Sequence, residues 1–263
     1  MPYGYKYGMG PSPQNPRSIL ITGASSGVGE AMAQSFAAPG VFLALTGRSR
    51  DRLEGVAAAC RAMGAEVEAE VIDVADRTAM EAWIPTVDDR HPVELVFANA
   101  GVSSGTVGED KDDIHRMFAT NVTGVLNTVL PLIPRFQARR GGQIALMASL
   151  AGLRGMPTAP AYAATKNAVR AWGDGLRPRL ARDGVKVSVI TPGFIVTRLT
   201  AANPFPMPML MPVDKAVRII RRGLVRNKGR IAFPWSLAAA SHIAIMLPNA
   251  LVDKFLMDFP FKE

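Results

Sequence analysis

Ser149, Tyr162 and Lys166 are the residues of this sequence whose types and spacing could do chemistry together. Tyr162 and Lys166 are four residues apart, so in a helix their side chains lie on one face, one turn apart. A neighbouring ammonium stabilises a phenolate, so we expect Lys166 to lower the pKa of Tyr162 from its ordinary value of about 10. Such a tyrosine could act as a general acid or base, with the Ser149 hydroxyl on the other side of the reacting oxygen.

A glycine-rich segment, T-G-A-S-S-G-V-G, runs from Thr22 to Gly29, between a predicted strand and a predicted helix. Glycines there allow a tight turn, and the backbone N–H groups at the positive end of the helix can approach a pyrophosphate. The alternative is an ordinary strand-to-helix turn. The candidate cofactor-binding residues of this segment are Gly23, Ser25, Ser26, Gly27, Val28 and Gly29.

The end of the second predicted strand favours NADP, with NAD as the second candidate. A free ribose 2′-hydroxyl calls for an acidic residue at this place, whereas this chain has Arg48 and Ser49. A guanidinium and a hydroxyl suit a 2′-phosphate. The alternative is a solvated loop arginine, because Arg50 and Arg52 make the neighbourhood basic in any case.

Three further strand ends carry candidate binding residues. Asp73, followed by Val74, could meet an adenine amino group or could cap the next helix. The segment A-N-A-G could let the backbone approach a ribose or could form a turn. In T-P-G-F-I-V-T the chain could bend over the nicotinamide. The candidates from these last two segments are Asn99, Ala100, Gly101, Pro192, Gly193, Ile195 and Thr197.

Asn121 lies within an apolar helical segment, where an amide is costly unless its polar groups find partners. It could be a satisfied core residue. It could equally kink the helix and hold a water that connects Lys166 to solvent.

Short apolar runs that alternate with amphipathic stretches predict an α/β fold with a doubly wound, seven-stranded parallel sheet. We expect a flexible leader over residues 1–16 and a single domain over residues 17–263. The predicted strands are Ser18–Ile21, Val41–Thr46, Val67–Ile72, Leu95–Ala98, Gln143–Met147, Lys186–Ile190 and Arg230–Phe233. The predicted helices are Gly27–Ala38, Arg50–Met63, Arg77–Asp88, Asp112–Gln137, Ala159–Arg182 and Val213–Arg226, with Pro131 and Pro134 kinking or ending the fourth.

Taken together, these motifs resemble the short-chain dehydrogenase/reductase family, over about Arg17 to Phe233 and in the family's order. The resemblance implies a single-domain Rossmann fold with strand order 3-2-1-4-5-6-7, and hydride transfer between a nicotinamide and a carbonyl or alcohol carbon. It implies that Tyr162 is the acid/base, that Ser149 orients the substrate, that Lys166 also binds ribose, and that Asn121 completes a proton relay. It also suggests homodimers or homotetramers packed through the fourth and fifth helices. One departure is Ala98, where the family often has an Asn that braces the sheet.

Composition narrows the partners. The net charge is +8, which fits an anionic cofactor or only a basic surface. The sequence lacks a basic run interleaved with aromatic residues, so nucleic acid is the least favoured partner. Cys60 is the single cysteine, and the three histidines are scattered, so we predict no disulfide and no metal site. No secretory signal and no apolar run of membrane-spanning length is recognisable, and we expect a cytoplasmic protein.

Two segments bear on the substrate. The loop 197–212 is proline-rich, and its Met207, Met209 and Met211 could accommodate varied apolar shapes or could pack a crossover loop. The apolar tail 234–263 could close over the pocket, pack between subunits or lie on a membrane surface, the last being the least favoured. We predict an NADP(H)-dependent oxidoreductase for the carbonyl or secondary alcohol of a lipophilic substrate. The alternative is a catalytically silent dinucleotide-binding sensor or scaffold.

Overall fold

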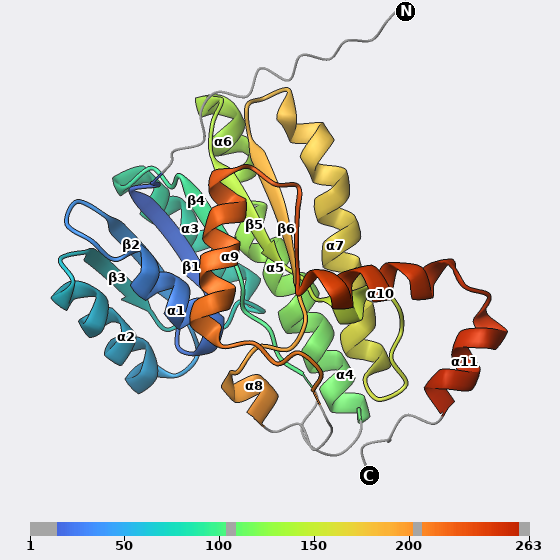
Figure 1. Ribbon diagram of the computed structural model, residues 1–263. Coiled ribbons are helices and arrows are strands. Elements are labelled where there is room, and N and C mark those ends of the chain that lie inside the picture. The colour runs from blue at the N-terminus through green and yellow to red at the C-terminus, as the bar shows by residue number, and fades with distance from the viewer. Residues whose placement is uncertain (1–14, 104–108, 202–206, 258–263) are drawn as a thin grey trace, which may run out of the picture.

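The computed structural model describes residues 15–103, 109–201 and 207–257 (Figure 1). Its centre is a seven-stranded parallel sheet with the strand order β3-β2-β1-β4-β5-β6-β7. The strands are β1 (Ser18–Thr22), β2 (Phe42–Thr46), β3 (Glu66–Glu70), β4 (Leu95–Ala98), β5 (Gln143–Met147), β6 (Lys186–Pro192) and β7 (Arg230–Phe233). The doubly wound fold is the one that the sequence pattern predicts, and the strand order is the one that the family resemblance implies.

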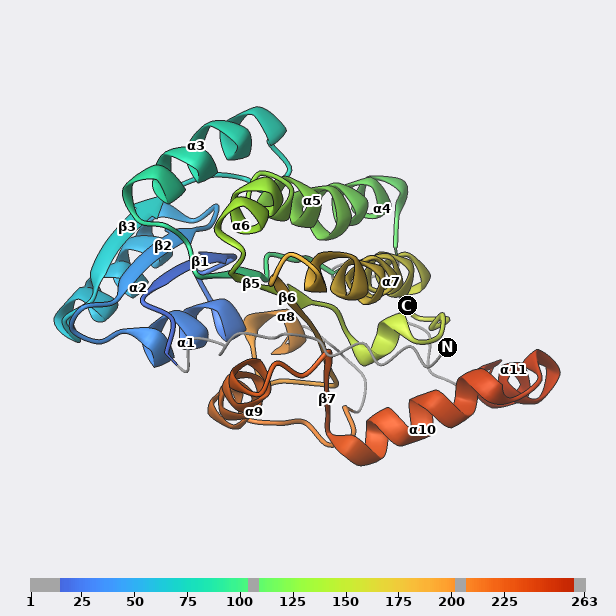
Figure 2. The same ribbon diagram turned by 90° about the horizontal axis from the view of Figure 1, so that it is seen from above.

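Helices cover both faces of the sheet (Figure 2). On one face lie α1 (Gly27–Phe36), α2 (Arg50–Ala62) and α9 (Val213–Val225). On the other lie α3 (Arg77–Arg90), α4 (Lys111–Phe118), α5 (Gly124–Val129), α6 (Ile133–Arg139) and α7 (Pro160–Ala181). Every residue of β1, β2 and β5 is buried between these layers, which explains why these strands read as continuous apolar runs.

The third strand begins and ends one or two residues earlier than predicted. The sequence predicts Val67–Ile72, whereas β3 pairs with β2 from Phe42↔Glu66 to Thr46↔Glu70. It is the edge strand, and its glutamates are not buried, so the apolar run did not mark its start. Glu68 accepts hydrogen bonds from Trp83 Nε1 at 2.9 Å and Arg90 Nη2 at 2.6 Å.

The predicted helix Asp112–Gln137 is divided into shorter pieces. The α4 helix passes into a π-helical segment, η1 (Ala119–Thr123), and then into α5. A break at Leu130–Leu132 separates α5 from α6, because Pro131 lacks the N–H that a continuous helix would need. Among the described residues, the stretch Lys111–Arg139 is the one that passes a length-and-composition test for a membrane span. Half of its most apolar window is buried in the protein, as in a core helix.

The segment after β7 forms two helices that the sequence analysis did not predict. They are α10 (Trp235–Met246) and α11 (Asn249–Met257), which extend outward from the body as an arm (Figure 2). The root of the arm packs through Ala238 on Leu150 and Leu153, in the 3₁₀ turn η2 (Leu150–Gly152) and the residue after it. Arg154 also donates a hydrogen bond to the carbonyl oxygen of Ala244 at 3.3 Å.

Candidate active site

A cavity of about 490 Å³ lies at the carboxyl ends of the strands, where a doubly wound sheet binds its ligands. It brings together nearly all the predicted site residues. Those that line it are Gly23, Ser25, Ser26, Gly27, Val28, Arg48, Ser49, Asp73, Val74, Asn99, Ala100, Gly101, Ser149, Tyr162, Lys166, Pro192, Gly193, Ile195 and Thr197. Gly29 and Asn121 do not line it and lie behind its wall.

The glycine-rich turn presents the N-terminus of α1 to this cavity. Ser26 is the N-cap residue, yet its side chain makes no capping hydrogen bond, so its hydroxyl is available to a ligand. A Cβ on Gly29 would lie 2.2 Å from the carbonyl oxygen of Gly23 and 2.7 Å from Asn99 Nδ2. The turn therefore needs glycine at position 29, because only glycine allows so close a backbone approach.

Arg48 and Asp73 face each other at the far end of the cavity, with Arg48 Nη1 3.9 Å from Asp73 Oδ2. Asp73 does not cap the following helix; Asp76 does, by accepting from the backbone N–H of Ala79 at 3.0 Å. Asp73 instead accepts from the N–H of Ala75. Its other oxygen remains directed at the guanidinium, in a position open to a ligand.

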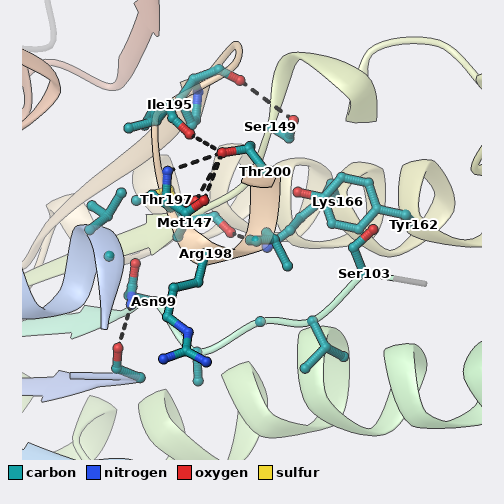
Figure 3. Close-up of a pocket in the computed structure, with 18 of the residues that line it drawn as sticks. Asn99, Ser103, Met147, Ser149, Tyr162, Lys166, Ile195, Thr197, Arg198 and Thr200 are labelled. Carbon is teal, nitrogen blue, oxygen red and sulfur yellow. Dashed lines mark hydrogen bonds between the residues drawn. The ribbon is translucent and has the colours of Figure 1, made fainter. Parts of the chain in front are cut away.

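Asn99, the residue after β4, joins the end of this strand to the end of β1. Its Nδ2 donates to the carbonyl oxygens of Thr22 at 3.0 Å and of Gly23 at 3.3 Å. The Thr22 hydroxyl in turn accepts from the backbone N–H groups of Asn99 and Ala100. These bonds hold the glycine-rich turn against the end of β4 (Figure 3).

Asn121 is a satisfied core residue in a distorted part of the helix, and its role in holding a water beside Lys166 stays a prediction. It is fully buried and satisfied: its Oδ1 accepts from Val102 N at 2.8 Å, and its Nδ2 donates to Val102 O and to Thr165 Oγ1. It also lies in the π-helical segment η1, so the helix is distorted at this residue. Asn121 thus connects the loop after β4 to the helix that carries Tyr162 and Lys166.

Tyr162 and Lys166 lie on one face of α7, as their spacing predicts, with Lys166 Nζ 5.7 Å from the centre of the Tyr162 ring. Lys166 is 3% exposed and donates to the carbonyl oxygen of Met147 at 3.0 Å. Burial lowers the pKa of Lys166 to about 8, because a buried ammonium loses hydration. Ser149 lies two residues after the end of β5, as the N-cap of the 3₁₀ turn η2 (Figure 3).

The expected lowering of the Tyr162 pKa is wrong for this structure. Burial raises the pKa of Tyr162, and the hydrogen bond with Ser149 opposes that rise only in part. Desolvation is the larger of these two effects, because the surrounding protein hydrates a phenolate less well than water does. At neutral pH the phenol is therefore protonated.

Glu109 is a site residue that the sequence analysis missed. Its carboxylate accepts hydrogen bonds from the backbone N–H groups of Ala161 at 2.6 Å and Tyr162 at 2.9 Å. These N–H groups belong to the first turn of α7, which has no capping side chain of its own. An acidic residue 53 positions before Tyr162 gave no local signal of this contact.

The other end of the cavity is mainly apolar. Its lining there includes Leu150, Ala151, Met156, Phe194, Leu199, Pro208 and Leu237, together with the hydroxyls of Ser103, Thr158 and Ser241. None of the three loop methionines at 207, 209 and 211 lines the cavity among the described residues. Met211 is buried in the core beside Ile195, so the crossover-packing interpretation holds for it. Leu237 and Ser241 show that α10 forms one wall.

The donor set fits a nicotinamide dinucleotide. The N-terminus of α1 offers backbone N–H groups and an uncommitted Ser26 hydroxyl to a pyrophosphate, and Arg48 with Ser49 could take a 2′-phosphate. Ser49 likewise makes no capping bond to its own helix. In the described part of the chain, no group of three or more His, Cys, Asp or Glu side chains could hold a metal ion.

Comparison with known proteins agrees with this geometry. The sequence matches the short chain dehydrogenase family over residues 17–204. An uncharacterised oxidoreductase of Myxococcus xanthus is 37% identical over 241 residues, which cover 90% of this chain and 95% of the relative.

Two solved structures show the same fold. A short-chain dehydrogenase of Sphingobium yanoikuyae in complex with NADPH has a TM-score of 0.76 at 27% identity, covering 89% of this chain and 97% of its own. An alcohol dehydrogenase of Thermococcus sibiricus complexed with 5-hydroxy-NADP has a TM-score of 0.71 at 28% identity, covering 82% of this chain and 94% of its own.

Proposed function

The chain belongs to the short-chain dehydrogenase/reductase family of oxidoreductases, and from this premise we propose that it is an NADP(H)-dependent reductase or dehydrogenase of a lipophilic carbonyl or secondary alcohol. The observation that carries the proposal is the meeting of Ser149, Tyr162 and Lys166 in a cavity that also holds the glycine-rich turn. A dinucleotide bound there would supply the hydride. The chain's own residues handle the proton and the substrate oxygen.

In the reducing direction, the carbonyl carbon gains a hydride and the carbonyl oxygen gains a proton from Tyr162 Oη. Burial raises the pKa of Tyr162, so the phenol is in the protonated form that can donate. The Ser149 hydroxyl would hold the same oxygen by a hydrogen bond. Lys166, one helical turn from Tyr162, would bind the ribose and favour the phenolate that remains after proton transfer.

The substrate class follows from the apolar wall of the cavity. Phe194, Leu199 and Leu237 offer hydrocarbon surface to a substrate. We propose that NADP is preferred because Arg48 and Ser49 stand where a 2′-hydroxyl would otherwise need a carboxylate. The two structural relatives solved with NADPH and 5-hydroxy-NADP support a nicotinamide cofactor in this cavity, and the preference itself rests on Arg48 and Ser49.

We further propose that the described body works as one catalytic unit and that copies of it assemble into dimers or tetramers. Exposed Phe118 and Leu130, both within the predicted fourth helix (Asp112–Gln137), support an interface on this side of the molecule. Sedimentation of the purified chain would test it, and a monomer at micromolar concentration would refute it.

The test of the function is Tyr162→Phe, assayed by NADPH consumption with aldehydes, steroids, quinones and long-chain 3-oxo compounds. Loss of a general acid should lower kcat by about 10²- to 10⁴-fold. NADPH affinity should stay unchanged, because the phenyl ring keeps its packing. Tyr7→Phe makes the same chemical change outside the described residues and serves as the matched control. Undiminished turnover by Tyr162→Phe, or no turnover by the wild type with any substrate class, would refute the assignment.

A further inference from the structure

Arg198 is a cation of the cavity that none of the motifs singled out. It is the first residue of the short helix α8 (Arg198–Ala201), directly after Thr197. Its side chain lines the cavity and extends into it from the loop after β6 (Figure 3). In that view it points toward the side of the crevice where Asn99 lies, rather than toward Tyr162.

The backbone at Arg198 is held in place beside the glycine-rich turn. A Cβ on Gly27 would lie 3.2 Å from the methyl group of Thr197, so the two loops are in contact. The Thr200 hydroxyl accepts from Thr197 N at 3.0 Å and donates to the carbonyl oxygen of Ile195 at 2.6 Å. These contacts fix the start of α8 next to the N-terminus of α1.

The Arg198 guanidinium is uncommitted. It has no ion pair and no side-chain hydrogen bond with any described residue. Among the described residues, four basic side chains line the cavity, against the one carboxylate of Asp73, which faces Arg48. The lining cations are Arg48, Arg52, Lys166 and Arg198. The excess of positive charge calls for more than one phosphate group, and Arg48 and Arg198 lie on different loops.

We propose that Arg198 binds the diphosphate bridge of the dinucleotide, opposite the backbone N–H groups of the glycine-rich turn. This inference rests on the proposed function. A guanidinium can donate two parallel hydrogen bonds to phosphate oxygens, which an ammonium cannot do. The diphosphate is then held between α1 and α8, so cofactor binding links the first βα unit to the segment that begins the substrate loop.

The diphosphate is common to NADPH and NADH, so Arg198 differs from Arg48 in a measurable way. Removing Arg198 should weaken both dinucleotides by the same factor. Removing Arg48 should weaken NADPH alone. Adenosine 2′-monophosphate has no diphosphate. Its affinity should therefore fall when Arg48 is removed and stay unchanged when Arg198 is removed.

The experiment measures dissociation constants by fluorescence of the bound reduced nicotinamide, and by calorimetry for adenosine 2′-monophosphate. Arg198→Ala should raise the dissociation constants of NADPH and NADH about 10- to 100-fold. Arg198→Lys should recover part of the loss, and the salt dependence of binding should be weaker in the alanine variant. Arg218→Ala, which removes an exposed arginine of α9, is the control for the change in net charge.

The possible failures are distinguishable. If the Arg198→Ala variant binds NADPH and NADH as tightly as the Arg218→Ala control does, the role of Arg198 is overturned while the proposed function stays intact. Unchanged cofactor affinity with a raised KM for an anionic substrate would assign Arg198 to the substrate and also overturn it. A wild-type chain that binds neither dinucleotide would refute the proposed function and this inference with it.

Discussion

The carboxylate of Glu109 accepts a hydrogen bond from the backbone N–H of Tyr162 at 2.9 Å, and a second from the neighbouring Ala161. The tyrosine is thus fixed through its own backbone, at the first turn of α7, by a residue from the segment before α4. A carboxylate at this end of a helix satisfies unpaired N–H groups and interacts favourably with the helix dipole. Glu109 therefore acts as a positioning residue for Tyr162.

Replacing Glu109 by Ala should lower the free energy of unfolding by about 1–2 kcal/mol, because two N–H groups lose their partner. We expect kcat to fall by about tenfold or more, since Tyr162 is no longer held in place. Glu109→Gln keeps one acceptor oxygen, so its stability and kcat should lie between those of the wild type and of Glu109→Ala. Urea unfolding and steady-state kinetics measure these effects, and Glu70→Ala, at an exposed glutamate, is the control. A variant with wild-type stability and kcat would contradict this role.

Arg48 should decide the choice between NADP and NAD. Arg48→Ala removes the guanidinium that would pair with the 2′-phosphate, so kcat/KM for NADPH should fall by about 10- to 100-fold. The value for NADH should stay within a factor of two or so. Arg50→Ala, which removes an arginine that does not line the cavity, is the matched control. An unchanged NADPH/NADH ratio would show that another residue reads the 2′ position.

Lys166 should be needed for activity but should lower the stability of the folded protein at neutral pH. Burial lowers the pKa of Lys166 to about 8 from its ordinary 10.5, so between these pH values the unfolded chain binds more protons than the folded one. The free energy of unfolding must therefore rise with pH across this window, by the contribution of Lys166.

In the Lys166→Met variant the contribution of Lys166 to the rise of the unfolding free energy with pH should be absent. Its unfolding free energy at pH 7 should at least equal that of the wild type. Its turnover should be nearly abolished. Thermal unfolding from pH 7 to 10.5 measures the difference, with Lys215→Met, at an exposed lysine of α9, as the control. Parallel curves for Lys166→Met and the wild type would mean that the amine is not buried in solution.

Two glycines should respond to alanine in opposite ways. Gly29→Ala places a Cβ 2.2 Å from the carbonyl oxygen of Gly23, so we expect a loss of about 1–3 kcal/mol or more and no detectable NADPH binding. Gly55→Ala, within α2, meets no atom within 4 Å and should stabilise the protein by about 0.5–1 kcal/mol. Chemical denaturation compares them. A tolerated alanine at position 29 would show that the turn differs from the one described.

The sequence by itself was enough for the fold and for most of the cavity lining. Apolar runs such as that of β1 mark buried parallel strands, because both faces of the sheet are covered. The glycine-rich turn and the Tyr162–Lys166 spacing are local features, so their neighbours along the chain suffice to recognise them. The strand ends then converge because the sheet is parallel.

Only the tertiary structure decided how these groups are tuned and held. The direction of the Tyr162 pKa depends on how much water is excluded around it, and the sequence shows only the neighbouring lysine. The contacts of Glu109 and Asn121, the wall formed by Leu237 and the placement of Arg198 all join segments far apart in the chain. Such contacts are made by packing between elements, and no local spacing along the sequence encodes them.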